Sequence, residues 1–147
     1  VLQGDADAAQ EFGEAEHCAV VDWKDGLEEV IQSVSDFLPQ GFLRVAASGP
    51  NGQALERHDG TRIEVPARHV KQEQLLVLVN QALAPHFELR RFRPMDGDGY
   101  SLLVESAEFW AELEHTQPEA TERYFLSVER LAAFWSRGFL ARLLNRP

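Results

Sequence analysis

The chain has 147 residues, of which 44% are hydrophobic and 26% charged, and this balance excludes a generally disordered protein. Its 24 acidic and 14 basic residues give a formal charge of −10, which disfavours nucleic acid and anionic membrane surfaces as partners. No apolar stretch of about 18 residues and no basic-then-apolar leader is present, so we expect a cytoplasmic protein without a membrane span.

Residues 1–16, rich in Ala, Asp, Glu and Gln, predict a loose tail or a short helix, and residues 17–147 predict a single α+β domain. The stretch HCAVVDWK (17–24) is short, apolar and β-branched at its centre, which is typical of a strand. Cys18 is the only cysteine, so neither a disulfide framework nor a multi-cysteine zinc site is possible. We expect it to be a buried, unreactive thiol.

The clearest helix is predicted over residues 25–38. Asp25 is expected to cap its first N–H groups, with Glu28 three residues later in the capping-box position, and Pro39 ends it. The apolar residues that recur at helical spacing are Leu27, Val30, Ile31, Val34, Phe37 and Leu38.

Three short strands are predicted next, over residues 42–47, 54–58 and 61–65, with an Asp-Gly turn between the last two. A second helix follows over residues 71–83. It is apolar over so much of its circumference that we expect other elements to cover it, and no capping residue stands at its start.

The stretch ELRRFRPMDGDGY predicts a hairpin with strands over residues 86–93 and 100–105. Asp96 and Asp98 stand as in a calcium-binding loop, but Tyr100 occupies the next ligand position and the closing glutamate is missing. We therefore predict an ordinary turn and no metal site. No nucleotide-binding glycine motif and no zinc-type histidine spacing occurs in the chain, so we expect no cofactor.

Three arginines, Arg90, Arg91 and Arg93, disturb the alternation of this hairpin's first strand. A β-bulge between the first two would bring Leu89 and Phe92 to the same face, and we predict such a bulge. The guanidinium groups would then point outward, either to pair with neighbouring carboxylates or to bind a carboxylate or phosphate of a ligand. The candidate ligand or partner residues of the hairpin are Arg90, Arg91, Arg93, Asp96, Asp98 and Tyr100.

Two helices and a longer terminal helix are predicted after the hairpin. Ser106, Thr116 and Ser127 are expected to cap them in turn. On the first of these helices we expect Phe109, Trp110 and Leu113 to face the core. The terminal helix has a second apolar face, which predicts a partner or dimer interface made by Phe134, Leu140 and Leu144.

The stretches VVDWKD, DGTRIEVP, LVNQALAPHFELR and GYSLLVESAEFWAELE resemble a family of small bacterial proteins of unknown function, over roughly residues 18–125. That family has a Ser-Asp-Thr turn where this chain has MDGDGY, and the resemblance implies no activity. The order helix, three strands, helix, two strands, helix also resembles the small acidic chaperones of type III secretion. Those chaperones hold an unfolded effector segment, usually as dimers. The extra first strand and the longer helical end depart from that pattern.

Together these elements predict an α+β fold in which helices pack on one mostly antiparallel sheet of five or six strands. The similar stretches EEVIQSVSDFLPQGFLRV and EQLLVLVNQALAPHFELR leave open a duplicated helix–hairpin unit. We favour a non-catalytic module that binds another protein or a second copy of itself, such as an adaptor, a chaperone or an immunity-type inhibitor. The alternative is a small-molecule or anion-binding protein, or an enzyme, centred on Arg90, Arg91 and Arg93.

Overall fold

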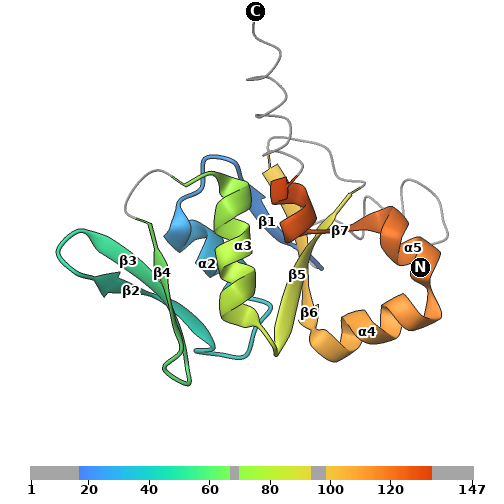
Figure 1. Ribbon diagram of the computed structural model, residues 1–147, viewed down its shortest axis with the longest axis horizontal. Coiled ribbons are helices and arrows are strands. Elements are labelled where there is room, and N and C mark those ends of the chain that lie inside the picture. The colour runs from blue at the N-terminus through green and yellow to red at the C-terminus, as the bar shows by residue number, and fades with distance from the viewer. Residues whose placement is uncertain (1–16, 67–69, 94–98, 134–147) are drawn as a thin grey trace, which may run out of the picture.

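The computed structural model describes residues 17–66, 70–93 and 99–133 (Figure 1). The strands are β1 (Ala19–Asp22), β2 (Leu43–Ser48), β3 (Gly52–Arg57), β4 (Arg62–Val65), β5 (Phe87–Phe92), β6 (Gly99–Ser106) and β7 (Phe125–Ser127). The helices are α2 (Leu27–Ser35), α3 (Gln72–Leu83), α4 (Ala107–Thr116) and α5 (Pro118–Tyr124), and residues 128–133 are also helical. The fold is α+β as expected, with β7 as a strand that the sequence did not predict.

The strands of the described residues form two antiparallel sheets, so the expected single sheet of five or six strands is wrong. Strands β2, β3 and β4 make a three-stranded meander, in which each strand pairs with its neighbour in the chain. The other sheet has the order β1-β6-β5-β7, and its first pair joins distant residues, with Ala19 opposite Leu102. The two sheets stay separate because α2 and α3 lie between them (Figure 1).

The elements stack in layers. The three-stranded sheet, the helix pair α2 and α3, the four-stranded sheet, and then α4 with α5 follow one another across the molecule (Figure 1). Helix α2 packs on β1 and β2, and α3 packs on β3, β4 and β5. Helix α3 is thus covered from two sides, as its broad apolar surface predicted, and it buries Leu75, Leu76, Val79, Asn80, Ala82 and Leu83.

Strand β5 keeps an unbroken register, so the predicted bulge is wrong. Arg90 lies opposite Leu103, and Arg91 lies opposite Leu102, without an inserted residue. Leu89 points into the core that contains the helix pair, whereas Phe92 points into a second core beneath α4. Both faces of this sheet are covered by helices, so apolar residues are accommodated on either side of the strand.

Arg57, at the end of β3, fastens the three-stranded sheet to the end of α3. Its Nη1 donates to the carbonyl oxygens of Ala84 at 2.5 Å and Ala82 at 3.4 Å, two carbonyls at the end of the helix. Its Nη2 donates to Asp59 at 2.7 Å and to Thr61 at 3.0 Å. The side chain is only 10% exposed, and one residue thereby closes the hairpin turn and satisfies the helix end.

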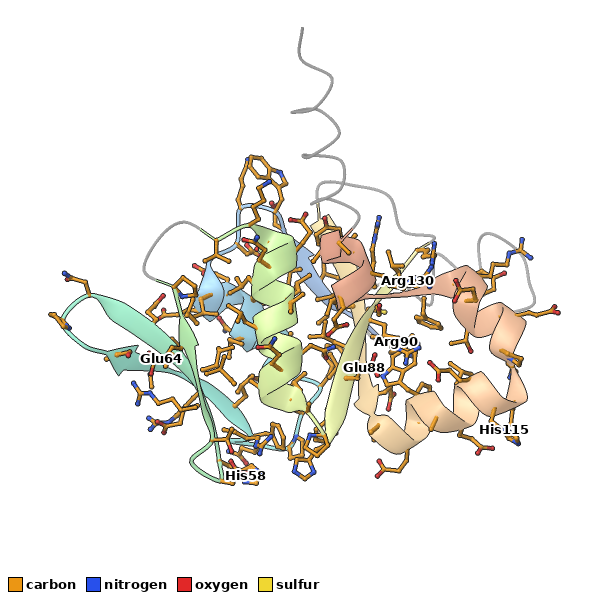
Figure 2. All side chains as sticks on the ribbon, in the orientation of Figure 1. His58, Glu64, Glu88, Arg90, His115 and Arg130 are labelled. Carbon is orange, nitrogen blue, oxygen red and sulfur yellow. The ribbon has the colours of Figure 1, made fainter. Side chains whose placement is uncertain are left out.

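Phe42 seals the same end of the molecule. The centre of its ring lies 4.9 Å from the ring centre of His58, 6.2 Å from that of His86 and 5.1 Å from that of Phe87. These residues come from the beginning of the meander, the β3–β4 turn and the beginning of β5. Figure 2 labels His58 at this end of the three-stranded sheet. We call the end of the helix pair at which Arg57 and Phe42 make these contacts the closed end.

Two of the predicted helix caps are confirmed. Ser106 Oγ accepts a hydrogen bond from the backbone N–H of Phe109 at 3.1 Å, at the start of α4. Ser127 Oγ accepts one from the N–H of Arg130 at 3.2 Å, at the start of the helix over residues 128–133. In both cases the serine is the last residue of a strand, and its hydroxyl replaces the missing intrahelical partner.

Two expectations about α4 and α5 are wrong. The Thr116 hydroxyl donates back to the carbonyl of Glu112 at 2.8 Å, so it does not cap α5, which begins after Gln117 without a side-chain cap. Phe109 is 38% exposed and does not face the core, whereas Trp110 is 1% exposed and does. A helix that lies on a sheet buries one narrow stripe, which Trp110 fills here together with the partly buried Leu113.

The duplicated helix–hairpin unit stays a prediction. Helix α2 is followed by the hairpin β2–β3, and α3 is followed by the hairpin β5–β6. The two hairpins belong to different sheets. Two helix–hairpin units without common descent could be arranged in the same way, so the arrangement does not test the duplication.

Candidate binding groove

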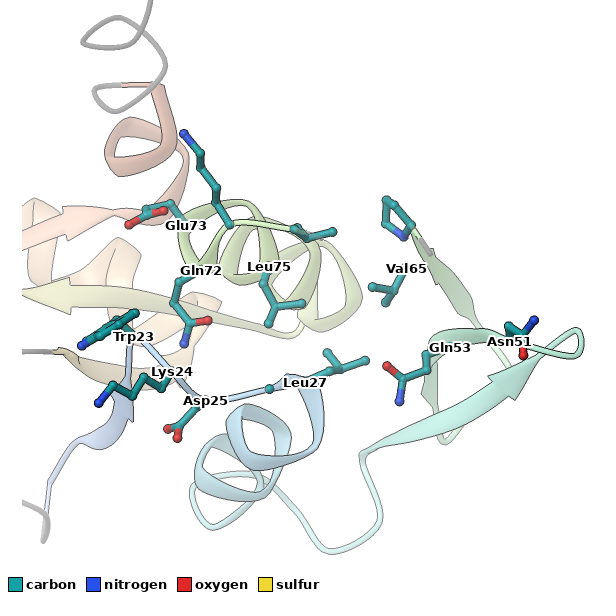
Figure 3. A pocket seen from close by; sticks show the side chains of 14 residues that line it. Trp23, Lys24, Asp25, Leu27, Asn51, Gln53, Val65, Gln72, Glu73 and Leu75 are labelled. Carbon is teal, nitrogen blue, oxygen red and sulfur yellow. The ribbon is translucent and has the colours of Figure 1, made fainter. Parts of the chain in front are cut away.

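A groove opens at the end of the helix pair opposite to Arg57, where the three-stranded sheet parts from the helices (Figure 3). It encloses about 750 Å³, which lies within the range of about 300–1,000 Å³ that is usual for ligand sites. Its walls come from the beginnings of α2 and α3 and from strands β3 and β4. The lining residues are Trp23, Lys24, Asp25, Gly26, Leu27, Asn51, Gln53, Val65, Pro66, Val70, Lys71, Gln72, Glu73 and Leu75.

Trp23 and Lys24 form one lip of the groove, in the turn between β1 and α2. Trp23 is 59% exposed, and the Lys24 ammonium lies 5.1 Å from the centre of its ring. The turn is held by Asp22, whose carboxylate accepts from the N–H of Lys24 at 2.9 Å and whose own N–H donates to Asp25 Oδ2 at 2.8 Å. A large aromatic side chain is thus held out in solvent by an ordered turn.

The turn also explains why the predicted cap at Asp25 is wrong. Its carboxylate is used by the N–H of Asp22, and α2 begins two residues later, at Leu27, with Gly26 in the capping position and no side-chain cap. Helix α3 begins after Lys71, again without a side-chain cap. Two helix beginnings therefore lie at one groove, and neither has a side-chain hydrogen bond from its capping residue.

The floor of the groove is apolar. Leu27 of α2, Leu75 of α3 and Val65 of β4 face one another across the hollow in Figure 3. Leu27 and Leu75 are 8% and 6% exposed, so they are core residues whose outer atoms reach the groove. Gln53 and Asn51 of the meander form the polar far side.

The acidic residues of the groove already have hydrogen-bond donors. Glu73 Oε1 accepts from the hydroxyl of Tyr100 at 2.6 Å, and Asp25 accepts from the N–H of Asp22. Gln72 donates through Nε2 to the carbonyl of Asp22 at 3.1 Å, which ties the beginning of α3 to the turn after β1. The candidate residue Tyr100 is thus found beside the groove, where it fixes a carboxylate of α3.

The structure places Arg90 on the α4 face of the four-stranded sheet. Its guanidinium binds both oxygens of Glu88, at 2.9 and 3.2 Å, and Glu114 at 2.7 Å. It also lies 4.4 Å from the centre of the Trp110 ring, and the side chain is 14% exposed. Of the two interpretations of this arginine, the arrangement is that of pairing with neighbouring carboxylates.

Arg91 is not brought together with Arg90. Arg91 lies on the opposite face of the sheet, where its guanidinium stacks 5.1 Å from the ring centre of Tyr100. Its Nε is buried and has no hydrogen-bond partner among the residues that the structure describes. Arg93 donates through Nε to the carbonyl of Phe125 at 3.4 Å. The sheet separates Arg91 from Arg90, so the three side chains do not all face one site.

Five of the sequence candidates, Asp96, Asp98, Phe134, Leu140 and Leu144, lie outside the described residues. Within residues 17–66, 70–93 and 99–133, no three His, Cys, Asp or Glu side chains are grouped to hold a metal ion. None of the helices in those ranges is long and apolar enough to cross a membrane.

Cys18 is buried as expected. It is 1% exposed and packs in the core beneath α4. Burial raises the pKa of its thiol to about 11, because the thiolate is poorly solvated there. The thiol therefore stays protonated near neutral pH, which is the state of an unreactive cysteine.

Sequence reasoning placed the helices and strands of the groove but not the groove itself. Two features of the sequence pointed to this region: Trp23 and Lys24 directly after a strand, and the missing cap at the beginning of α3. Neither signal shows that the two helix beginnings meet, since that depends on how the layers stack. No protein-family model, no curated protein and no solved structure matches the chain, so the groove has no counterpart from which a role follows.

Proposed function

We propose that the protein is a non-catalytic protein-binding module and that the groove receives a segment of its partner. The observation that carries this proposal is Trp23, 59% exposed on the lip of a groove of about 750 Å³. Tryptophan is enriched among the residues that dominate the energy of protein interfaces, because it buries a large rigid surface at little entropic cost. An adaptor, a chaperone and an immunity-type inhibitor all fit this description.

The lining of the groove supports binding rather than catalysis. Among the lining residues that the structure describes, none is a serine, a cysteine or a histidine. Its two carboxylates, on Asp25 and Glu73, already accept structural hydrogen bonds. The alternative, an anion site centred on the arginines, has less support because the Arg90 guanidinium is already bound by two carboxylates.

The order of the elements adds a weaker argument for the chaperone form of the proposal. The succession α2, three strands, α3, two strands and α4 is the order that resembles the type III secretion chaperones. Holding an unfolded segment of another protein is compatible with an open groove and an exposed aromatic lip. This argument is one of analogy between folds, so the groove and not the fold carries the proposal.

The test is affinity capture from the native host followed by mass spectrometry, with wild-type chain and two variants as bait. Trp23→Ser removes the lip residue, and Phe109→Ser removes the exposed aromatic of α4, 38% exposed, as a matched control. We expect a protein that wild type and Phe109→Ser recover equally and that Trp23→Ser recovers about tenfold less or not at all. Circular dichroism checks that all three baits are folded. Recovery of no protein, or of the same proteins by all baits, would overturn the proposal.

A further inference from the structure

We infer that Asn51 is a site of spontaneous modification, at which the side-chain amide is lost as ammonia and aspartate or isoaspartate takes its place. This inference does not rest on the proposed function, although Asn51 lines the groove. It follows from the chemistry of an asparagine that precedes a glycine, and from the difference in how the structure holds Asn51 and Asn80.

The reaction joins the asparagine side chain to the next backbone nitrogen. That nitrogen loses its proton to solvent and attacks the side-chain carbon Cγ, so a new C–N bond closes a succinimide ring while the amide nitrogen takes up a proton and leaves as ammonia. Water then opens the ring at either of its two carbonyls, which gives aspartate or isoaspartate. A following glycine favours ring closure because no side chain obstructs the attack. The sequence has one Asn-Gly pair, Asn51-Gly52.

The structure leaves this pair open to the reaction. Asn51 is exposed and ends the turn over residues 49–51, between β2 and β3. Figure 3 shows its side chain at the tip of the meander, away from both helices. Gly52, which supplies the attacking nitrogen, forms the terminal pair of the β2–β3 ladder with Ser48. The end of a hairpin ladder opens more easily than its centre, so both reacting groups are accessible to solvent and to each other.

The same turn requires the glycine that makes Asn51 reactive. A Cβ atom at position 52 would lie 2.1 Å from the backbone carbonyl oxygen of Ser48, far inside van der Waals contact. The turn begins with Gly49 at a φ of 64°, a left-handed conformation that favours glycine. The tight hairpin and the reactive pair are therefore two consequences of one local sequence.

Asn80 shows the opposite arrangement. It lies within α3 and is 8% exposed, and Gln81 follows it in place of a glycine. Its Nδ2 donates to Glu129 Oε1 at 3.0 Å, and its Oδ1 accepts from the backbone N–H of Leu89 at 3.0 Å. Both atoms of the amide are thus held, and the helix must open before the side chain is free to react.

The modification would change the groove itself. Asn51 and Gln53 form the polar far side of the groove. Loss of the amide puts a carboxylate there, and isoaspartate also adds a methylene group to the main chain of the turn. The groove of an aged molecule would therefore differ in charge and in backbone from that of a newly made one.

The experiment follows the full chain during incubation in mildly alkaline buffer, with peptide mapping by mass spectrometry. We expect the amide to be lost at Asn51 at least about tenfold faster than at Asn80. Both aspartate and isoaspartate should appear at position 51, because the ring opens on either side. Asn51→Gln is the matched control. It keeps an amide in the groove but should lose it far more slowly, since glutamine has to close a larger ring.

A second incubation in urea separates the effect of the fold from that of the sequence. Unfolding should accelerate the loss at Asn80 much more than the loss at Asn51. Equal rates at the two asparagines in the folded chain, or aspartate at position 51 without isoaspartate, would overturn the inference. So would an Asn51 that keeps its amide in the folded chain and loses it only in urea. None of these measurements involves a partner protein, so their failure would leave the proposed function untouched.

Discussion

The two ends of the helix pair differ in how completely the three-stranded sheet is joined to the rest of the molecule. At the closed end, Arg57 reaches two carbonyls at the end of α3, and Phe42 contacts three rings from other segments. At the other end the same sheet parts from the same helices, and Trp23 stands in solvent beside the gap. One meander thus has a well-packed end and an open one. The groove is therefore a local feature and not a sign of a loosely packed protein.

Truncation of one aromatic residue at each end should show the largest difference. Phe42 is 6% exposed and Trp23 is 59% exposed. Phe42→Ala leaves a cavity at the closed end and should lower the free energy of unfolding by about 3–4 kcal/mol. Trp23→Ala removes little buried surface and should change it by less than about 0.5 kcal/mol. Urea denaturation followed by circular dichroism measures both, and equal losses would mean that the ends do not differ as described.

Removal of one arginine from each side of the meander should give the next largest difference. Arg57→Ala leaves the last carbonyls of α3 without their donor and should cost about 2 kcal/mol of unfolding free energy. Arg44→Ala breaks an ion pair with Glu56 on the outer face, where Arg44 is 69% exposed, and should cost less than about 0.5 kcal/mol.

A lysine at position 57 provides a further check on the reason for that loss. Arg57→Lys should recover only part of the stability, because an ammonium group cannot reach the helix end and Asp59 with the same fork of donors. Urea denaturation of the three variants gives the comparison. Full recovery by lysine would show that charge alone, and not the geometry of the guanidinium, fastens this end.

The smallest expected effect is a pH dependence at Asp59. Hydrogen bonds from Arg57 and Thr61 lower the pKa of its carboxyl below the ordinary value of 3.8. The folded state thus favours the carboxylate, and this contribution is complete above that value and is lost as the pH falls toward the folded pKa. The melting temperature of wild type should exceed that of Asp59→Asn at pH 7, and the difference should shrink below about pH 4. In an Arg57→Ala background the difference should be smaller but not absent, because the hydrogen bond from the N–H of Thr61 to Asp59 remains.

The sequence predicted local structure well because helix stripes and caps depend on residues that are close together in the chain. The stripe of α2, the broad apolar surface of α3 and the serine caps at Ser106 and Ser127 each need only a few consecutive residues, and the structure confirms them. The caps at Asp25 and Thr116 were wrong because a competing backbone group uses each side chain. A capping sequence shows which side chains are able to bond, but not which of two nearby partners they choose.

The arrangement of the sheets could not be read from the sequence in the same way. The bulge was predicted at Arg90 and Arg91 to bring Leu89 and Phe92 to one face, which is necessary only if one face is covered. Here the helix pair covers one face and α4 covers the other, so ordinary alternation buries both Leu89 and Phe92. The same stacking of layers creates the groove. The stacking depends on contacts between segments that are distant in the sequence, and such contacts produce no recognisable residue pattern.

The pairing of β1 with β6 has a consequence for the order in which the molecule forms. Strand β1 is synthesised early, but its partner in the described chain, β6, follows only after the meander and both helices, on the order of ten seconds later. The meander needs only neighbouring strands and is able to form before that. Pulsed amide exchange during refolding should therefore protect Leu55 of β3 before Leu102 of β6. The three-stranded sheet, which leaves the groove open in the finished protein, would be the part that is ready first.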